Sequence, residues 1–162
     1  MNDPTDAVVI ERALSFATEA MWTVELQVRR LNSDEPEDDR FVGRWWVDLQ
    51  FLISTLRRLR RTAELAARRV DSEALQDAIA GFDHALPNLK KMRDVNEHFD
   101  SYVLDDVGRH DKSVDRTQLQ VGSWNGHIYS WLSDADEGLL TLDVDAARDA
   151  AFALYEAVRS LG

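Results

Sequence analysis

Residues 41–70, "FVGRWWVDLQFLISTLRRLRRTAELAARRV", carry the longest regular pattern in the chain. Its apolar positions, separated by three, four and once seven residues, are Val42, Trp46, Leu49, Ile53, Leu56, Ala63, Ala67 and Val70. A helix makes one turn in about 3.6 residues, so this spacing gathers the apolar side chains on one face. The stretch therefore predicts one long amphipathic helix and makes a mainly α-helical fold the expectation.

Four further segments have the same helical periodicity, namely residues 6–31, 73–86, 88–104 and 144–161. Ser72 and Asp143 stand just before two of them, and both residue types favour the N-cap of a helix. Pro87 must end the third helix at Leu86, because its ring removes a backbone donor and crowds the preceding turn. The acidic residues 32–39 surround Pro36 and predict a loop.

Residues 117–132, "TQLQVGSWNGHIYSWL", change the period from helical to alternating on both sides of Asn125-Gly126. Asn-Gly is the typical two-residue turn of a β-hairpin. That turn would pair Trp124 with His127, Gly122 with Tyr129 and Gln120 with Trp131, all on one aromatic face. The other face, which we expect to pack on the helices, carries Leu119, Val121, Ser123, Ile128, Ser130 and Leu132. Residues 139–142 would add a third strand.

The predicted architecture is a bundle of about five helices. A small antiparallel β-hairpin, about residues 117–142, is inserted before the last helix. The chain has 162 residues, of which 44% are hydrophobic, so we expect a single domain over residues 1–162 with one core.

The chain is acidic, with 30 acidic against 19 basic residues and a formal net charge of −11. This charge works against binding of duplex nucleic acid or anionic membranes, except at a local basic surface. The absence of cysteine excludes disulfides and thiolate zinc sites and fits a reducing compartment. The N-terminus is acidic where a signal peptide is basic, and no apolar run could span a bilayer. We therefore expect a cytoplasmic protein that makes no membrane contact.

Residues 89–102, "LKKMRDVNEHFDSY", contain an arginine followed at once by an acid, with a histidine five positions after the arginine. This arrangement, late in a helical domain, resembles the R-x4-6-H motif of the HEPN family. The resemblance implies paired helical domains whose two motif copies face each other, and many members are metal-independent ribonucleases. It implies that His98 is the general acid or base at a ribose 2′-hydroxyl, that Arg93 holds the phosphate and that Asp94 orients its neighbours.

Arg93 and His98 would lie about 140° apart around a continuous helix. One chain alone would therefore address a ligand poorly, whereas a homodimer could complete a site. The alternative is an ordinary helix surface, on which Arg93 and Glu97 are i,i+4 partners and Asp94 pairs with a preceding lysine. His98 would then be a partly buried histidine beside Phe99.

Residues 56–69, "LRRLRRTAELAARR", contain six arginines. As a phosphate-binding stripe, Arg57, Arg58, Arg60 and Arg61 would hold the backbone of a nucleic acid or a nucleotide. Alternatively, the many acids elsewhere in the chain pair with these arginines, whose stems cover apolar surface.

The hairpin side chains Trp124, Tyr129 and Trp131 form a second candidate binding surface. Exposed, they would stack on bases or receive a second subunit, and they are our first candidate for a dimer interface. Alternatively, a helix covers them. The His and acidic residues show no typical metal-ligand spacing, so we expect neither a metal site nor a cofactor.

Two hypotheses about function follow. The chain is a dimeric HEPN-like ribonuclease, or a nucleotide-binding relative, that acts through Arg93, Asp94 and His98. Alternatively, it is a non-catalytic protein-interaction module that uses the aromatic face of the hairpin. The first hypothesis requires an accessible His98 near Arg93 and the arginine-rich segment.

Overall fold

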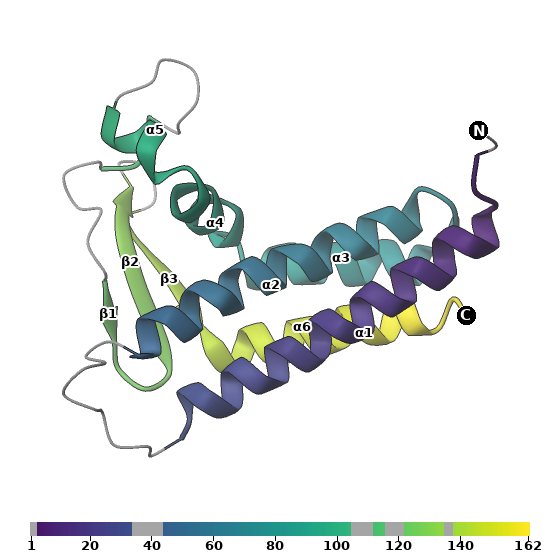
Figure 1. Cartoon of the computed structure of the whole chain (residues 1–162), viewed down its shortest axis with the longest axis horizontal. Helices are drawn as coiled ribbons and strands as arrows, with labels where there is room; N and C mark the ends of the chain where they lie inside the picture. The colour runs from purple at the N-terminus through teal and green to yellow at the C-terminus, as the bar shows by residue number, and fades with distance from the viewer. Residues whose placement is uncertain (1–2, 34–43, 105–111, 116–121, 135–137) are drawn as a thin grey trace.

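The computed structural model describes residues 3–33, 44–104, 112–115, 122–134 and 138–162 (Figure 1). The helices are α1 (Asp6–Leu31), α2 (Arg44–Ala67), α3 (Glu73–Ala85), α4 (Leu89–Glu97), α5 (Phe99–Leu104) and α6 (Val144–Arg159). The strands are β1 (Ser123–Trp124), β2 (Ile128–Asp134) and β3 (Gly138–Asp143), and they form one antiparallel sheet in that order. The mainly α fold with a small antiparallel sheet before the last helix is confirmed.

The core lies between α1, α2, α3 and α6. Helices α1 and α2 run side by side in opposite directions, and α6 packs against α1, α2 and α3 (Figure 1). Helix α4 packs on α2 near the sheet. The apolar stripe of α2 is fully buried between these neighbours, at Leu49, Leu52, Ile53, Leu56, Leu59, Ala63 and Ala66. None of the helices in the described ranges is long and apolar enough to cross a membrane.

Both predicted helix caps are confirmed. The Ser72 hydroxyl accepts a hydrogen bond from the Leu75 amide at 3.3 Å, and the Asp143 carboxylate accepts one from the Ala146 amide at 2.9 Å. Helix α1 has the predicted bounds, and α3 ends one residue before the predicted Leu86. Helix α2 ends at Ala67 rather than at residue 70, because the amides of Arg69 and Val70 both donate to the Ala66 carbonyl. Its predicted residues 41–43 lie outside the described residues.

The predicted helix over residues 88–104 is broken at His98, which separates α4 from α5. The break changes which side chains are buried: Tyr102 is 2% exposed, whereas Phe99 and Val103, which continue the helical spacing of α4, are 65% and 63% exposed. The prediction of one helix was therefore wrong, because the burial of Tyr102 requires a new helix direction after His98.

The hairpin was predicted at the right place but in the wrong register. Trp124 pairs with Tyr129 and Ser123 with Ser130, so the turn is centred on Gly126-His127 rather than on Asn125-Gly126. The Asn125 side-chain oxygen accepts hydrogen bonds from the amides of His127 (3.0 Å) and Ile128 (2.7 Å), and Gly126 supplies a positive φ of 98°. The predicted third strand is confirmed as β3, whereas predicted strand residues 117–121 lie outside the described residues.

The aromatic face of the sheet packs on α2. Tyr129 and Trp131 are buried, with ring centroids 6.0 Å apart, and Gln50 donates a hydrogen bond to the Tyr129 hydroxyl at 3.3 Å. On the opposite face Ile128 is 37% exposed. The expectation that the opposite face packs on the helices was therefore wrong, because the larger rings contribute more apolar area to the core. Leu119, Val121 and the Leu132 side chain lie outside what the structure describes.

Candidate functional site

Arg93 is held by the two acids that follow it on α4. Its Nη1 donates a hydrogen bond to Asp94 at 2.9 Å, and its Nη2 pairs with Glu97. The Arg93 side chain is only 16% exposed, and burial alone would lower its pKa, but the bonds to Asp94 and Glu97 outweigh burial and raise the pKa of Arg93 above its ordinary value. The predicted i,i+4 pair with Glu97 is therefore present, and Asp94 pairs with Arg93.

His98 is exposed at the junction of α4 and α5. Its amide donates to the Asp94 carbonyl at 3.0 Å, and its own carbonyl accepts from the Ser101 amide at 2.9 Å. These backbone bonds fix the residue while its ring is left in contact with solvent. The expectation of a partly buried histidine is therefore not met, and the ring is accessible to a substrate.

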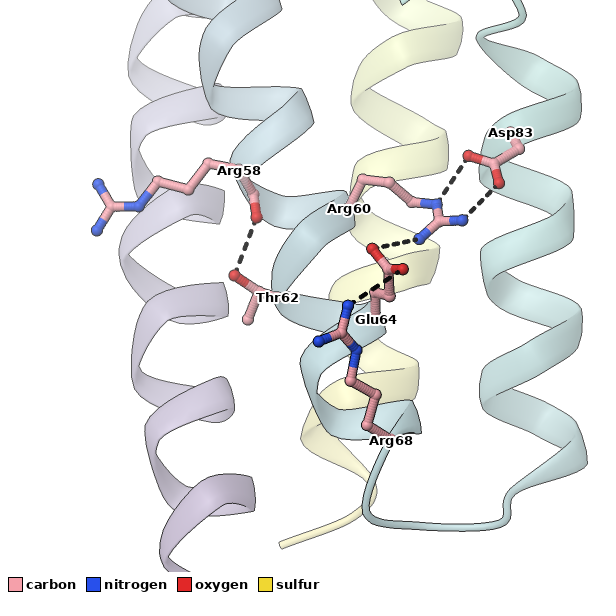
Figure 2. Close-up of polar contacts among 6 residues, drawn as sticks. All are labelled: Arg58, Arg60, Thr62, Glu64, Arg68 and Asp83. Atoms are coloured by element: carbon pink, nitrogen blue, oxygen red, sulfur yellow. Dashed lines mark hydrogen bonds and ion pairs between the residues drawn. The ribbon is translucent and has the colours of Figure 1, made fainter. Parts of the chain in front are cut away.

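The arginine-rich segment does not form one surface. Arg60 donates two hydrogen bonds to Asp83 on α3, both at 2.8 Å, whereas Arg58 pairs with Glu19 on α1 at 3.0 Å. Figure 2 shows the Arg58 side chain directed away from Arg60 and Asp83. The pairing alternative thus holds for Arg58 and Arg60, and also for Arg68 and Arg69. Arg61 is exposed.

Arg57 differs from these paired arginines. It is half-buried, and its Nε has no hydrogen-bond partner. Burial, followed by the positive charge of Arg61, lowers the pKa of Arg57, and Asp94 opposes this effect. Because Arg93 also contributes to this lowered pKa, Arg57 lies within electrostatic range of the Arg93-Asp94 pair. Arg57 is therefore a residue of the predicted basic segment that interacts electrostatically with Arg93 and Asp94 of the predicted catalytic motif.

Two hollows lie beside these residues. The larger, of about 390 Å³, is lined by three basic residues, two acids and three apolar residues: Arg57, Arg60, Lys90, Glu64, Asp83, Leu86, Pro87 and Leu89. The smaller, of about 250 Å³, shares Pro87 and Lys90 and extends to Asp94 and Tyr102. Sequence reasoning missed Lys90 as a lining residue, although the proline break before α4 predicts a junction of two helix ends where a hollow can form.

The three aromatic residues of the hairpin are not available as one exposed surface. Tyr129 and Trp131 are buried, and Trp124 is half-buried. Trp45 of α2 packs edge-on against Tyr129, with ring centroids 6.2 Å apart. Burial raises the pKa of the Tyr129 hydroxyl, so this group is neutral. The rings therefore join the sheet to α2 and do not present a stacking platform.

Metal ligands are not gathered in the part of the chain that the structure describes, where no group of three or more His, Cys, Asp or Glu side chains could hold an ion. Comparison with known proteins identifies no relative: no family model matches the chain, and no curated protein or solved structure is significantly similar to it. The function must therefore be argued from the residues of the site.

Proposed function

We propose that the chain is a HEPN-like, metal-independent ribonuclease of the cytoplasm that acts as a homodimer, with Arg93, Asp94 and His98 as its catalytic residues. The observation that carries this proposal is the accessible His98 at the α4–α5 junction, directly after the Arg93-Asp94-Glu97 cluster. Arg93 and Asp94 of this cluster lie within electrostatic range of Arg57. Metal-independent RNA cleavage needs a group that transfers protons and cations that bind the phosphates. The accessible histidine can transfer protons, and the fixed guanidinium and the neighbouring basic segment can bind phosphates.

The proposed chemistry is transfer of the phosphoryl group to the ribose 2′-oxygen. His98 accepts the 2′-hydroxyl proton as this oxygen attacks the phosphorus, and the 5′-oxygen of the next nucleotide leaves with a proton from a general acid. A guanidinium has five N–H donors, so Arg93 can bind its two acids and still offer donors to a phosphate oxygen. Asp94 keeps the guanidinium in that orientation.

The second copy would dock beside His98. Helix α5 exposes Phe99, Val103 and Leu104, which are 65%, 63% and 71% exposed. Contiguous exposed apolar side chains are typical of surfaces that bind another protein. A twofold contact through α5 would cover these side chains and bring the two copies of the motif together.

A non-catalytic interaction module is the second candidate. The observation that favours it is Trp22 of α1, which is 72% exposed and lies away from the motif in sequence. In this form of the proposal the binding surface is on the helices rather than on the buried rings of the hairpin.

The test of catalysis is cleavage of single-stranded RNA by the purified full chain and by His98→Ala. We expect the substitution to lower the cleavage rate by about 10²- to 10⁴-fold, the usual contribution of a general acid or base. His84→Ala is the matched control, because His84 is also exposed but lies on α3. Equal rates for wild type and His98→Ala in the absence of contaminating nuclease would contradict the proposal.

The dimer is tested separately by co-expressing Arg93→Ala and His98→Ala. A site made from both copies would be intact once in each mixed dimer, so about a quarter of the wild-type activity should return. No recovery, or a single-chain mass for the active species by light scattering, would contradict a site shared between two copies.

A further inference from the structure

The larger hollow is built where two helices end against α2. Helix α3 ends at Ala85, Pro87 prevents its continuation, and α4 begins at Leu89. Leu86 and Leu89 are buried and form an apolar wall, whereas Pro87 is exposed at the rim. The hollow, at about 390 Å³, lies in the size range of small-ligand sites.

The polar side chains of the hollow differ in how they are paired. Arg60 is bound to Asp83 at 2.8 Å and lies 4.0 Å from Glu64, so its charge is compensated within the protein (Figure 2). Among the residues that the structure describes, neither Arg57 nor Lys90 has an ion-pair partner. The lining therefore combines two cations without an ion pair, Arg57 and Lys90, with two acids, Glu64 and Asp83, that are bound by Arg60.

Of these two cations, Arg57 is the one whose charge is less well compensated by its surroundings. Its buried Nε makes no hydrogen bond, so no protein acceptor fixes this side of the guanidinium or compensates its charge. The neighbouring positive charges of Arg61, Arg60 and Arg93 act on the same guanidinium. A phosphate oxygen bound at the accessible part of the Arg57 guanidinium would compensate these charges.

The hollow is not isolated from the proposed catalytic motif. The second hollow, of about 250 Å³, shares Pro87 and Lys90 with it and continues along α4 to Asp94 and Tyr102. Asp94 precedes His98 on α4 and Tyr102 follows it on α5. A strand lying along both hollows would pass from Arg57 to Asp94 and Tyr102, which stand in sequence on either side of His98. A lone anion would occupy only one hollow.

We propose that the hollow between α2 and the α3–α4 junction binds one nucleotide of a single-stranded RNA, adjacent to the cleaved bond, with Arg57 and Lys90 holding its phosphate. This assignment rests on the proposed ribonuclease function for the identity of the ligand. The sugar or base lies against Leu86 and Pro87, which offer no hydrogen bonds to base edges, so the site holds the strand without selecting its sequence.

The experiment measures binding of a fluorescent 2′-O-methyl RNA hexamer, which has no 2′-hydroxyl to attack the phosphate, so that binding is separated from cleavage. We expect Arg57→Met and Lys90→Met each to weaken binding by about tenfold, as for the loss of a charge-assisted hydrogen bond. Arg58→Met is the matched control, because it removes the same charge from the adjacent residue on the α1 side, and binding should change by less than about twofold.

Salt dependence supplies a second readout. Each phosphate neutralised on a single strand adds about 0.7 to the slope of log affinity against log salt. Arg57 and Lys90 hold the same phosphate, so the double variant Arg57→Met, Lys90→Met should lower that slope by about 0.7 relative to wild type. Circular dichroism melting of each variant shows whether a loss of binding comes from unfolding.

The outcomes separate this site from the proposed function. Unchanged binding by folded Arg57→Met and Lys90→Met overturns the site, even if His98→Ala abolishes cleavage. An equal loss in Arg58→Met also overturns it, since general charge would then explain the binding. Weakened binding by both variants without any RNA cleavage by wild type supports the site and overturns the ribonuclease. Binding of 5′-AMP as tight as that of the hexamer overturns the RNA strand as its ligand.

Discussion

Arg57 and Arg58 are adjacent in the sequence, yet α2 places them in opposite electrostatic surroundings. A helix turns by about 100° per residue, so the two side chains leave α2 on different sides. Arg58 meets Glu19 at 3.0 Å, and its guanidinium lies 5.8 Å from the centre of the Phe16 ring. Arg57 lies among other arginines, and its Nε has no acceptor. Both residues are arginines, so the residue type does not distinguish them. What distinguishes a structural arginine from a candidate ligand-binding one is whether an acidic side chain of the protein is close enough to pair with it.

Arg60 is the third case on the same helix. Its side chain is 18% exposed and is satisfied by a two-point bond to Asp83. Arg60 is therefore buried and paired, Arg58 is exposed and paired, and Arg57 is half-buried and unpaired. Substitution of each arginine by methionine, which keeps much of the apolar stem, should give three different changes in the free energy of unfolding.

Arg60→Met should have the largest effect. It removes a two-point, charge-assisted pair between the largely buried Arg60 and the half-exposed Asp83, so we expect the free energy of unfolding to fall by about 1–2 kcal/mol. Urea unfolding followed by circular dichroism measures the change. Asp83→Asn should destabilise the protein by a similar mechanism, and the double variant should lose less than the two single losses together. An Arg60→Met protein as stable as wild type would show that the pair contributes nothing.

Arg57→Met should act in the opposite direction. A base whose pKa is lower in the folded than in the unfolded state holds its proton less well when folded, so its charge reduces stability at neutral pH. After allowance for solvent screening of this half-exposed group, we expect stability to rise by up to about 1 kcal/mol. The same urea titration measures it. A clear loss of stability would show that Arg57 has a structural role and would remove the contrast with Arg60.

Arg58→Met should have the smallest effect. Both partners of the pair are exposed, with 53% of the Arg58 and 58% of the Glu19 side chain accessible. Exposed pairs of this kind are worth little, so we expect a change within about 0.5 kcal/mol, and a smaller one still in 1 M salt. If Arg58→Met cost more than Arg60→Met, burial would not be what separates the two pairs.

The sequence predicted the long elements well because their signals are local. The apolar spacing in α1 and α2 and the caps at Ser72 and Asp143 depend only on nearby residues. The break at His98 was not predictable in this way, because the helical spacing continues through Phe99 and Val103. What accompanies the break is the burial of Tyr102, which is a property of the folded chain and does not appear in the apolar spacing.

The hairpin was predictable in position but not in register. The Asn-Gly pair identified the turn. The Asn125 side-chain oxygen, however, accepts hydrogen bonds from the amides of His127 and Ile128, and the turn lies one residue further along the chain than predicted. Both faces of the strands carry apolar side chains, so alternation could not show which face is buried. That choice follows from contacts with Trp45 and Gln50 on α2.

The candidate site was predicted in part. The motif residues Arg93, Asp94 and His98 were chosen from a local pattern, but the arginines of α2 are equivalent in the sequence. Their partners are distant: Glu19 is 39 residues from Arg58, and Asp83 is 23 residues from Arg60. Only the tertiary fold shows that Arg57 lacks such a partner and that Lys90 lies in the same hollow.

The packing of α6 has a consequence for the order of folding. Helix α6 contacts α1, although most of the chain lies between them in sequence, and it also closes the core against α2 and α3. Helices α1 and α2 can pair early, since a short connection joins them, whereas closing the loop that brings α6 to α1 costs more entropy. During synthesis, the apolar faces of α1, α2 and α3 stay exposed until residues 144–159 have been made. In that interval chaperones can bind these faces, or the chain can aggregate.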